Sequence, residues 1–180
     1  MLSRLNLSEG VKMLRAAVAT DPKRAEAHNA LGVGLGHMGL APEAQREFEL
    51  ALALRPDYPS ARFNLAEALQ KSGHVDQAIE NFRQVIAAYP QDDTARYGLQ
   101  KALEAGARES IKQGDWKSAA AAYSELVGLA PSDAGLRNDY GEVLLHLNQA
   151  GKAREQFEKA LALDPANEAA RRNRDALDAH

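Results

Sequence analysis

Apolar residues recur three and four positions apart along most of the chain, which is the spacing of one face of an α-helix. Leu31, Leu35 and Met38 show this spacing in one segment, and Ala44 and Phe48 show it in the next. A half-buried strand would instead alternate apolar and polar residues. The pattern therefore predicts a chain of amphipathic helices.

The same pattern repeats along the chain with a period of 34 residues. The prolines that mark the period are Pro22, Pro56, Pro90, Pro131 and Pro165, with one interval of 41 residues before Pro131. Two further columns keep these intervals: Leu14, Phe48, Phe82, Tyr123 and Phe157, and Gly10, Ala44, Ala78, Ala119 and Ala153. A fixed period of this length is typical of stacked structural repeats.

Each repeat contains a break near its middle. The residues at the break are Gly39, Gly73, Gly114 and Asn148, the two residue types that best tolerate the left-handed conformation that ends a helix. The prolines then end the second helix, because the residue before a proline disfavours helical geometry. Every repeat is thus predicted to be two antiparallel helices.

These columns resemble the signature of the tetratricopeptide repeat (TPR) family, which places Leu-Gly, Gly, Ala, Phe, Ala and Pro at this spacing. One repeat matches through Leu31, Gly32, Gly39, Ala44, Phe48, Ala51 and Pro56. Another matches through Tyr140, Gly141, Ala153, Phe157, Ala160 and Pro165. The resemblance covers essentially the whole chain. It implies an all-α fold, a right-handed α-solenoid of antiparallel helix pairs (TPR superhelix), whose concave face binds peptides or partner proteins.

We expect a single TPR domain over residues 1–180. Its predicted parts are a half-repeat with the second helix only at 1–24, full repeats at 25–58, 59–92, 93–133 and 134–167, and a capping helix at 168–180. The cap carries Arg174 and Asp175 in the columns of Leu31 and Gly32, which suits a solvated end.

The long interval places seven extra residues between Leu99 and Gly114, inside the repeat 93–133. Seven residues make about two helical turns, so the simplest interpretation lengthens the first helix of this repeat to about residues 94–113. The extra turns are either plain length variation or one wall of a partner site that carries Arg96, Lys101 and Arg108.

The first 24 residues lack a first helix. Asn6 followed by Glu9 predicts a helix start through a capping box. Leu7, Leu14 and Val18 should then face the absent helix and form an exposed apolar stripe. We expect an upstream domain or self-association to cover this stripe.

Composition narrows the classes of partner. The chain has 22 Lys and Arg against 25 Asp and Glu, a net charge of -3, which gives no field for nucleic acid or an anionic membrane. No window has the roughly 18 apolar residues of a membrane span, and the first ten residues lack the apolar core of a signal peptide. The chain has no cysteine, which excludes disulfides and thiolate metal sites. Cytoplasm and periplasm both remain open.

The resemblance implies a peptide-binding concave face formed by the first helix of each repeat. The candidates are Asn29, Val33, His37, Phe63, Asn64, Glu67, Lys71, Tyr97, Arg108, Lys112, Asn138, Glu142 and His146. Amide and ammonium groups can hydrogen-bond a peptide backbone, and Phe63 and Tyr97 offer apolar anchors. An ordinary solvated helix face carries the same residue types, and that alternative stays open.

Two finer patterns within this set bear on the ligand. His37, Lys71, Lys112 and His146 share one column, which suits either an acidic ligand or the favourable placement of cations at helix C-termini. The family's carboxylate clamp of Lys, Asn, Asn, Lys and Arg is matched only at Asn64. The positions compared are Asn29, Val33, Asn64, Thr94 and Gly98, so we do not expect a chaperone-type clamp.

A third pattern is only partly present. Asn29, Asn64 and Asn138 resemble the asparagine ladder of the family's glycosyltransferase-linked members, but they do not occupy one column.

The enzyme-like signals in the chain have simpler explanations. Gly34, Gly36 and Gly39, with Asp57 downstream, spell a dinucleotide-binding pattern, but that pattern needs a preceding strand and this segment is helical. Gly34 and Gly36 each cost about 1 kcal/mol inside a helix, so they permit close approach either by a ligand or by a neighbouring helix.

The remaining candidate chemistry is structural. The five histidines show no zinc-type spacing, and we expect no metal site, no cofactor and no catalytic residues. Asp115 is predicted to cap a second helix, with Trp116 packed in the core at the boundary between repeats.

The sequence thus predicts a non-enzymatic scaffold that holds a peptide or protein segment in a groove. The alternative is the tethering or recruiting region of a larger enzyme or secretion machine that precedes residue 1.

Overall fold

The computed structural model describes residues 2–178, with side chains from residue 6 onward. This described part contains ten α-helices and no strand. The first helices of the four repeats are α2 (Ala25–His37), α4 (Pro59–Lys71), α6 (Asp93–Lys112) and α8 (Ala134–His146). The second helices are α3 (Ala41–Leu54), α5 (Val75–Ala88), α7 (Trp116–Leu129) and α9 (Ala150–Leu163). Helix α1 (Leu2–Thr20) precedes them and α10 (Glu168–Asp178) follows.

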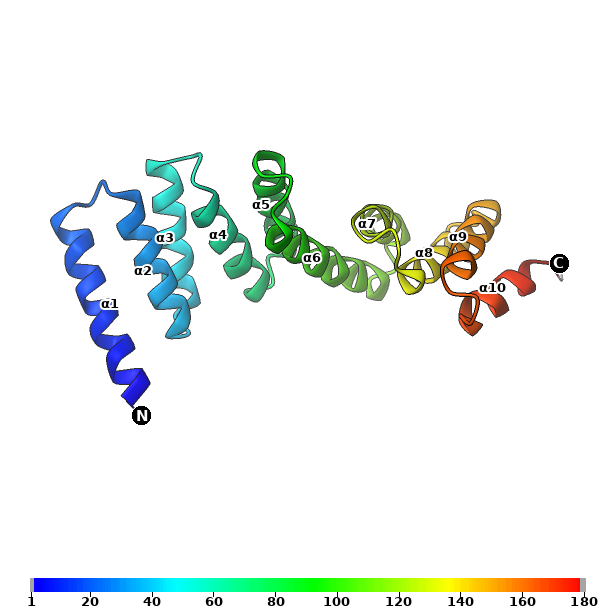
Figure 1. Ribbon diagram of the computed structural model, residues 1–180, viewed down its shortest axis with the longest axis horizontal. Helices are drawn as coiled ribbons and strands as arrows, with labels where there is room; N and C mark the ends of the chain where they lie inside the picture. The colour runs from blue at the N-terminus through cyan, green and yellow to red at the C-terminus, as the bar shows by residue number, and fades with distance from the viewer. Residues whose placement is uncertain (1, 179–180) are drawn as a thin grey trace. The chain divides into compact units, whose positions relative to one another are not determined.

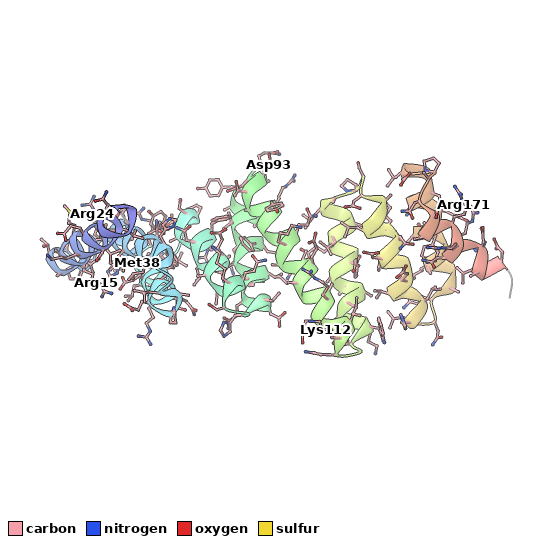
Figure 2. The ribbon with its side chains drawn as sticks, turned by 90° about the horizontal axis from the view of Figure 1, so that it is seen from below. Arg15, Arg24, Met38, Asp93, Lys112 and Arg171 are labelled. Carbon is pink, nitrogen blue, oxygen red and sulfur yellow. The ribbon has the colours of Figure 1, made fainter. Side chains whose placement is uncertain are left out.

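Helix lengths account for the irregular interval in the sequence. The first helices α2, α4 and α8 have 13 residues each, and α6 has 20, seven more. Asp93 and Lys112, labelled in Figure 2, mark the two ends of α6. The second helices α3, α5, α7 and α9 all have 14 residues. The predicted lengthening of this one helix is confirmed, one residue earlier than expected.

The mid-repeat breaks form left-handed helix ends as predicted. Backbone φ is 79° at Gly39, 82° at Gly73, 73° at Gly114 and 57° at Asn148. The next residue's N–H then closes each end by donating to a carbonyl five residues back. An example is Leu40 N to Leu35 O at 3.0 Å. The glycine column is therefore explained by backbone geometry.

The chain forms two compact parts, Met1–Leu99 and Gln100–His180, which are described separately. In the first part, α1 to α5 follow one another side by side in chain order (Figure 1). In the second part, each of α7 to α10 packs on the next. Successive first helices also touch, α2 with α4, and the cap α10 contacts α8 in the same way.

Aromatic rings of the second helices rest on glycines of the first helices. A methyl group added to any of these glycines would lie 2.3 to 2.5 Å from a ring carbon. The contacts are Phe48 on Gly32, Phe82 on Gly98 and Phe157 on Gly141. All three rings are buried. The Phe and Leu-Gly columns thus record one packing contact that recurs along the chain.

A cation in each repeat binds the carbonyl of the proline that precedes it. Arg62 donates to Pro56 O at 2.6 Å, and Arg137 donates to Pro131 O at 2.9 Å. Arg171 donates to Pro165 O in the same way. In the first repeat this column holds His28 instead, which contacts Pro22 O at 3.0 Å and Glu47 at 2.7 Å. These contacts fasten each inter-repeat turn to the next helix.

Two expectations for the N-terminal segment are wrong. Helix α1 begins at Leu2, so Asn6 lies inside the helix and does not cap it. No proline or glycine stands before Asn6 to stop the helix from extending backwards.

The predicted open stripe on α1 is wrong as well. Leu7, Leu14 and Val18 are half-buried, and Leu14 reaches to 3.5 Å from the Cβ position of Gly34 on α2. Since α1 turns Leu14 towards α2, Met13 is the large apolar residue that α1 exposes, at 68%.

The cap helix α10 begins where it was expected, at Glu168, and its predicted last residue, Ala179, lies outside the described residues. Leu177 packs against the core cluster of Leu144, Ala153 and Phe157, while Arg174 forms an ion pair with Asp175 at 2.6 Å. None of the helices in the described part of the chain is long and apolar enough to span a bilayer.

Candidate functional site

Helices α2 and α4 bring two of the predicted amides together. Asn64 Nδ2 on α4 donates to Asn29 Oδ1 on α2 at 2.9 Å. Asn29 Nδ2 in turn approaches the hydroxyl of Tyr58 at 3.4 Å. Within the described residues no group donates to Asn64 Oδ1. The pair therefore links two successive first helices and leaves an amide oxygen available.

Next to this pair lies a hollow of about 240 Å³ between α2, α3 and α4. Five of the predicted residues line it: Val33, His37, Asn64, Glu67 and Lys71. The remaining lining residues are Gly32, Gly36, Ala41, Ala44, Phe48 and Ala68. The hollow thus has a polar rim and a floor of small or apolar residues.

The rim carries little net charge. Lys71 Nζ lies 3.7 Å from Glu67 Oε2, and both side chains are largely exposed, so the pair contributes at most about 1 kcal/mol. His37 ends α2 and Lys71 ends α4, which is where the helix dipole favours a cation. These charges do not by themselves select an acidic ligand.

The two aromatic anchors are placed differently from each other. Phe63 is half-buried, with its ring edge-on to Phe82 at 5.6 Å between centroids, and it lines a second hollow of about 350 Å³ beside Asn64. Tyr97 on α6 is 63% exposed and is not among the residues of either hollow. Phe63 therefore serves the core and the surface together.

In the second part of the chain, the predicted polar residues satisfy one another. Asn138 on α8 is buried, 6% exposed, and donates to Glu142 at 2.9 Å. Asn173 on α10 donates to Asn138 Oδ1 at 3.0 Å and to Glu142 at 2.9 Å. Asn138 was expected on an open face, and that expectation is wrong because α10 covers it.

Asn173 was missed in the sequence, although a signal was available. It follows Asn138 by 35 residues, the same separation as between Asn29 and Asn64. One period plus one residue places two amides opposite each other on successive first helices. The apparent mismatch of columns in the asparagine pattern is the geometry of these pairs.

The remaining candidates of the second part are engaged locally. Arg108 Nε donates to Glu104 O at 3.2 Å, and Lys112 lies 3.4 Å from Glu109 on the same helix. His146, at the end of α8, stacks face to face on Trp116 with 3.6 Å between ring centroids and 4° between planes.

The stack partly corrects the prediction for Trp116. The residue does lie between repeats, but it is half-buried and covers an exposed histidine rather than filling the core. Asp115 caps α7 as predicted, accepting from Ser118 N at 3.1 Å and from Ser118 Oγ at 2.6 Å. The hydroxyl and backbone N–H of Ser118 hold the pKa of Asp115 below its usual value.

The two glycines left open by the sequence have different roles. A methyl group on Gly34 would lie 2.9 Å from Val11, so this glycine admits a neighbouring helix. Gly36 lines the hollow, and the nearest atom to its Cβ position is Ala44 Cβ at 3.9 Å. No group of three His, Cys, Asp or Glu residues able to hold a metal ion occurs in residues 2–178.

Several solved structures share this fold at low identity. The MamA fragment 41-end from Desulfovibrio magneticus RS-1 is 22% identical, with 93% of this chain and 90% of that chain covered and a TM-score of 0.57. YrrB, described as a TPR protein with an unusual peptide-binding site, is 20% identical over 97% of this chain and 87% of its own, with a TM-score of 0.61. The TPR domain of P58(IPK) is 24% identical over 98% of this chain and 51% of its own, with a TM-score of 0.52.

Family models give the assignment directly. No curated protein sequence matches the chain significantly. Two family models, each described as a tetratricopeptide repeat, match residues 37–103 and 108–178. TPR proteins are generally scaffolds for interaction between proteins rather than enzymes. The chain belongs to the tetratricopeptide repeat family.

Proposed function

We propose that this chain is a protein-interaction scaffold that binds an extended segment of a partner protein on the face formed by α2 and α4. The observation that carries the proposal is the gathering of Val33, His37, Asn64, Glu67 and Lys71 around one hollow. An extended peptide presents backbone N–H and C=O groups beside its side chains, so it suits a surface with amides next to an apolar floor.

The amide pairs favour this face over the face formed by α8 and α10. The offset that relates Asn29 to Asn138 also relates Val33 to Glu142. Glu142 accepts hydrogen bonds from both amides of its own pair, whereas Val33 offers no acceptor and is 37% exposed. The pair on α2 and α4 therefore keeps hydrogen-bonding capacity that a partner's backbone can use.

A peptide selection on the intact chain tests the proposal. Random 12-residue peptides displayed on phage are enriched on the wild-type chain, and the affinity of one enriched peptide is measured for Asn64→Ala and Asn173→Ala. Each substitution removes one amide bond between first helices, so the two variants form a matched pair. We expect Asn64→Ala to weaken binding about 5- to 30-fold, since one hydrogen bond contributes about 1 to 2 kcal/mol.

The control variant Asn173→Ala should bind within about twofold of wild type, because its amide is already used by Glu142. Enrichment of no peptide by the wild-type chain would overturn the assignment of a peptide-binding scaffold. An equal loss of binding in both variants would overturn the assignment of the site to α2 and α4.

A further inference from the structure

Gly36 has no role in the packing of this chain. It lies inside α2, and its backbone does not adopt the positive φ found at Gly39. Space is available at its Cβ position, with the nearest atom 3.9 Å away, whereas Gly32 meets Phe48 at 2.5 Å. Glycine also weakens a helix interior relative to alanine. The fold alone therefore gives no reason for a glycine at this position.

The second part of the chain shows what fills this place in another repeat. The equivalent pairs of positions are Ala44 and Ala153, Phe48 and Phe157, Gly36 and Leu145, and Ala68 and Leu177. Leu145 and Leu177 both pack against the cluster of Leu144, Ala153 and Phe157. Between α8, α9 and α10 two leucines thus occupy the volume that is empty between α2, α3 and α4.

We propose that the hollow is a specificity pocket for one aliphatic side chain, of the size of leucine or isoleucine, from the bound partner segment. This inference rests on the proposed function and adds the chemistry of the ligand. The equivalent place in the second part holds leucine side chains, so an aliphatic group matches its shape and its apolar surroundings. Burial of such a group beside Phe48 and Ala44 removes apolar surface from water.

The rim defines how the side chain is presented. Asn64 Oδ1 borders the hollow and, within the described residues, receives no hydrogen bond. A segment in extended conformation has free backbone N–H groups beside its side chains, and one of them can donate to Asn64. A helical segment has already used its backbone N–H groups. The occupant is therefore an aliphatic residue within an extended segment.

The experiment fills the hollow from within. Gly36→Leu places a leucine where Leu145 stands in the other repeat, and Gly128→Leu is the control, since Gly128 is an exposed helical glycine with nothing within 4 Å of its Cβ position. Phage selections are run on wild type and on both variants. We expect wild type and Gly128→Leu to enrich peptides with Leu, Ile or Val at one fixed position, and Gly36→Leu to lose this preference.

A double-mutant cycle sharpens the test. Replacing the selected aliphatic residue of the peptide by alanine should weaken binding to wild type at least about tenfold, but to Gly36→Leu by less than about twofold. Gly36→Ala, which adds one methyl group, should give an intermediate effect if the leucine variant does not fold.

The outcomes separate the two proposals. If wild type enriches no peptide, the proposed function fails. If it enriches peptides without an aliphatic preference, or if Gly36→Leu binds them equally, the pocket is overturned and the scaffold function stands. If wild type dimerises in solution and Gly36→Leu does not, the occupant is a second copy of the chain and the inference is overturned.

Discussion

A single residue difference makes one inter-repeat contact sensitive to protonation. His28 is buried, and both of its ring nitrogens face acceptors, Nδ1 the carboxylate of Glu47 on α3 and Nε2 the carbonyl of Pro22. Both contacts are hydrogen bonds only when both nitrogens carry a proton. Burial lowers the pKa of His28, but the hydrogen bonds to Glu47 and Pro22 outweigh burial and the pKa lies above its usual value.

The raised pKa predicts a pH dependence of stability. A group whose pKa is higher in the folded state contributes its full stability below the unfolded value, about 6.5, and loses it as the pH rises through the folded value. Between about pH 6 and pH 9 the wild-type chain should therefore lose about 1 to 2 kcal/mol of unfolding free energy. Urea unfolding followed by circular dichroism measures this change.

The matched variant is His28→Arg, which introduces the residue that holds the same place at Arg62 and Arg137. Because arginine stays protonated, the variant should show a smaller loss over the same pH range. Equal pH profiles for variant and wild type would exclude His28 as the titrating group.

At the scale of the element, the contact between ring and glycine fixes how closely paired helices approach. A methyl group on Gly32 would lie 2.5 Å from Phe48, a ring that is 4% exposed and has no room to move away. Gly128 lies in a helix as well, but nothing is within 4 Å of its Cβ position. The two glycines thus separate packing from helix propensity.

Gly32→Ala should destabilise the chain by about 1 to 3 kcal/mol through overpacking. Gly128→Ala should instead stabilise it by up to about 1 kcal/mol, because alanine favours the helix. Thermal unfolding of both variants beside wild type checks the signs. A stable Gly32→Ala variant would mean that the helices can separate at little cost.

Most of the elements could be predicted from the sequence, because their ends depend on local geometry and a fixed period. The breaks at Gly39 and Asn148 and the long helix α6 follow from residue type and spacing alone. The state of the candidate site could not be predicted in this way. Column positions place Asn64 and Asn138 on first helices, but whether their amides are free or already bonded depends on Glu142 and on other repeats.

At the scale of the whole molecule, the two parts of the chain are packed to different degrees. Helix α2 contains Gly32, Gly34 and Gly36, and a hollow lies beside it. Helix α8 instead contributes Leu144 to a core that Leu145 and Leu177 complete. In repeat proteins each unit is stabilised mainly by its own packing and by its nearest neighbours, so these differences stay local.

Hydrogen exchange should therefore be uneven along the chain. We expect backbone amides of α2 and α3 to exchange about tenfold faster than those of α8 and α9, a ratio that corresponds to about 1.4 kcal/mol of local stability. Mass spectrometry of peptide fragments resolves the two regions. Gly36→Leu should slow exchange in α2 and leave α9 unchanged, whereas uniform exchange in wild type would contradict the packing difference.

The length of α6 has a consequence for how its gene can change. Seven residues turn a helix by about 700°, only about 20° short of two full turns, so the apolar face of α6 continues almost in line beyond the extra residues. The loss of one codon would rotate every later side chain of that helix by about 100°. Insertions and deletions in this segment are therefore tolerable in multiples of seven codons, and a single-codon change is not.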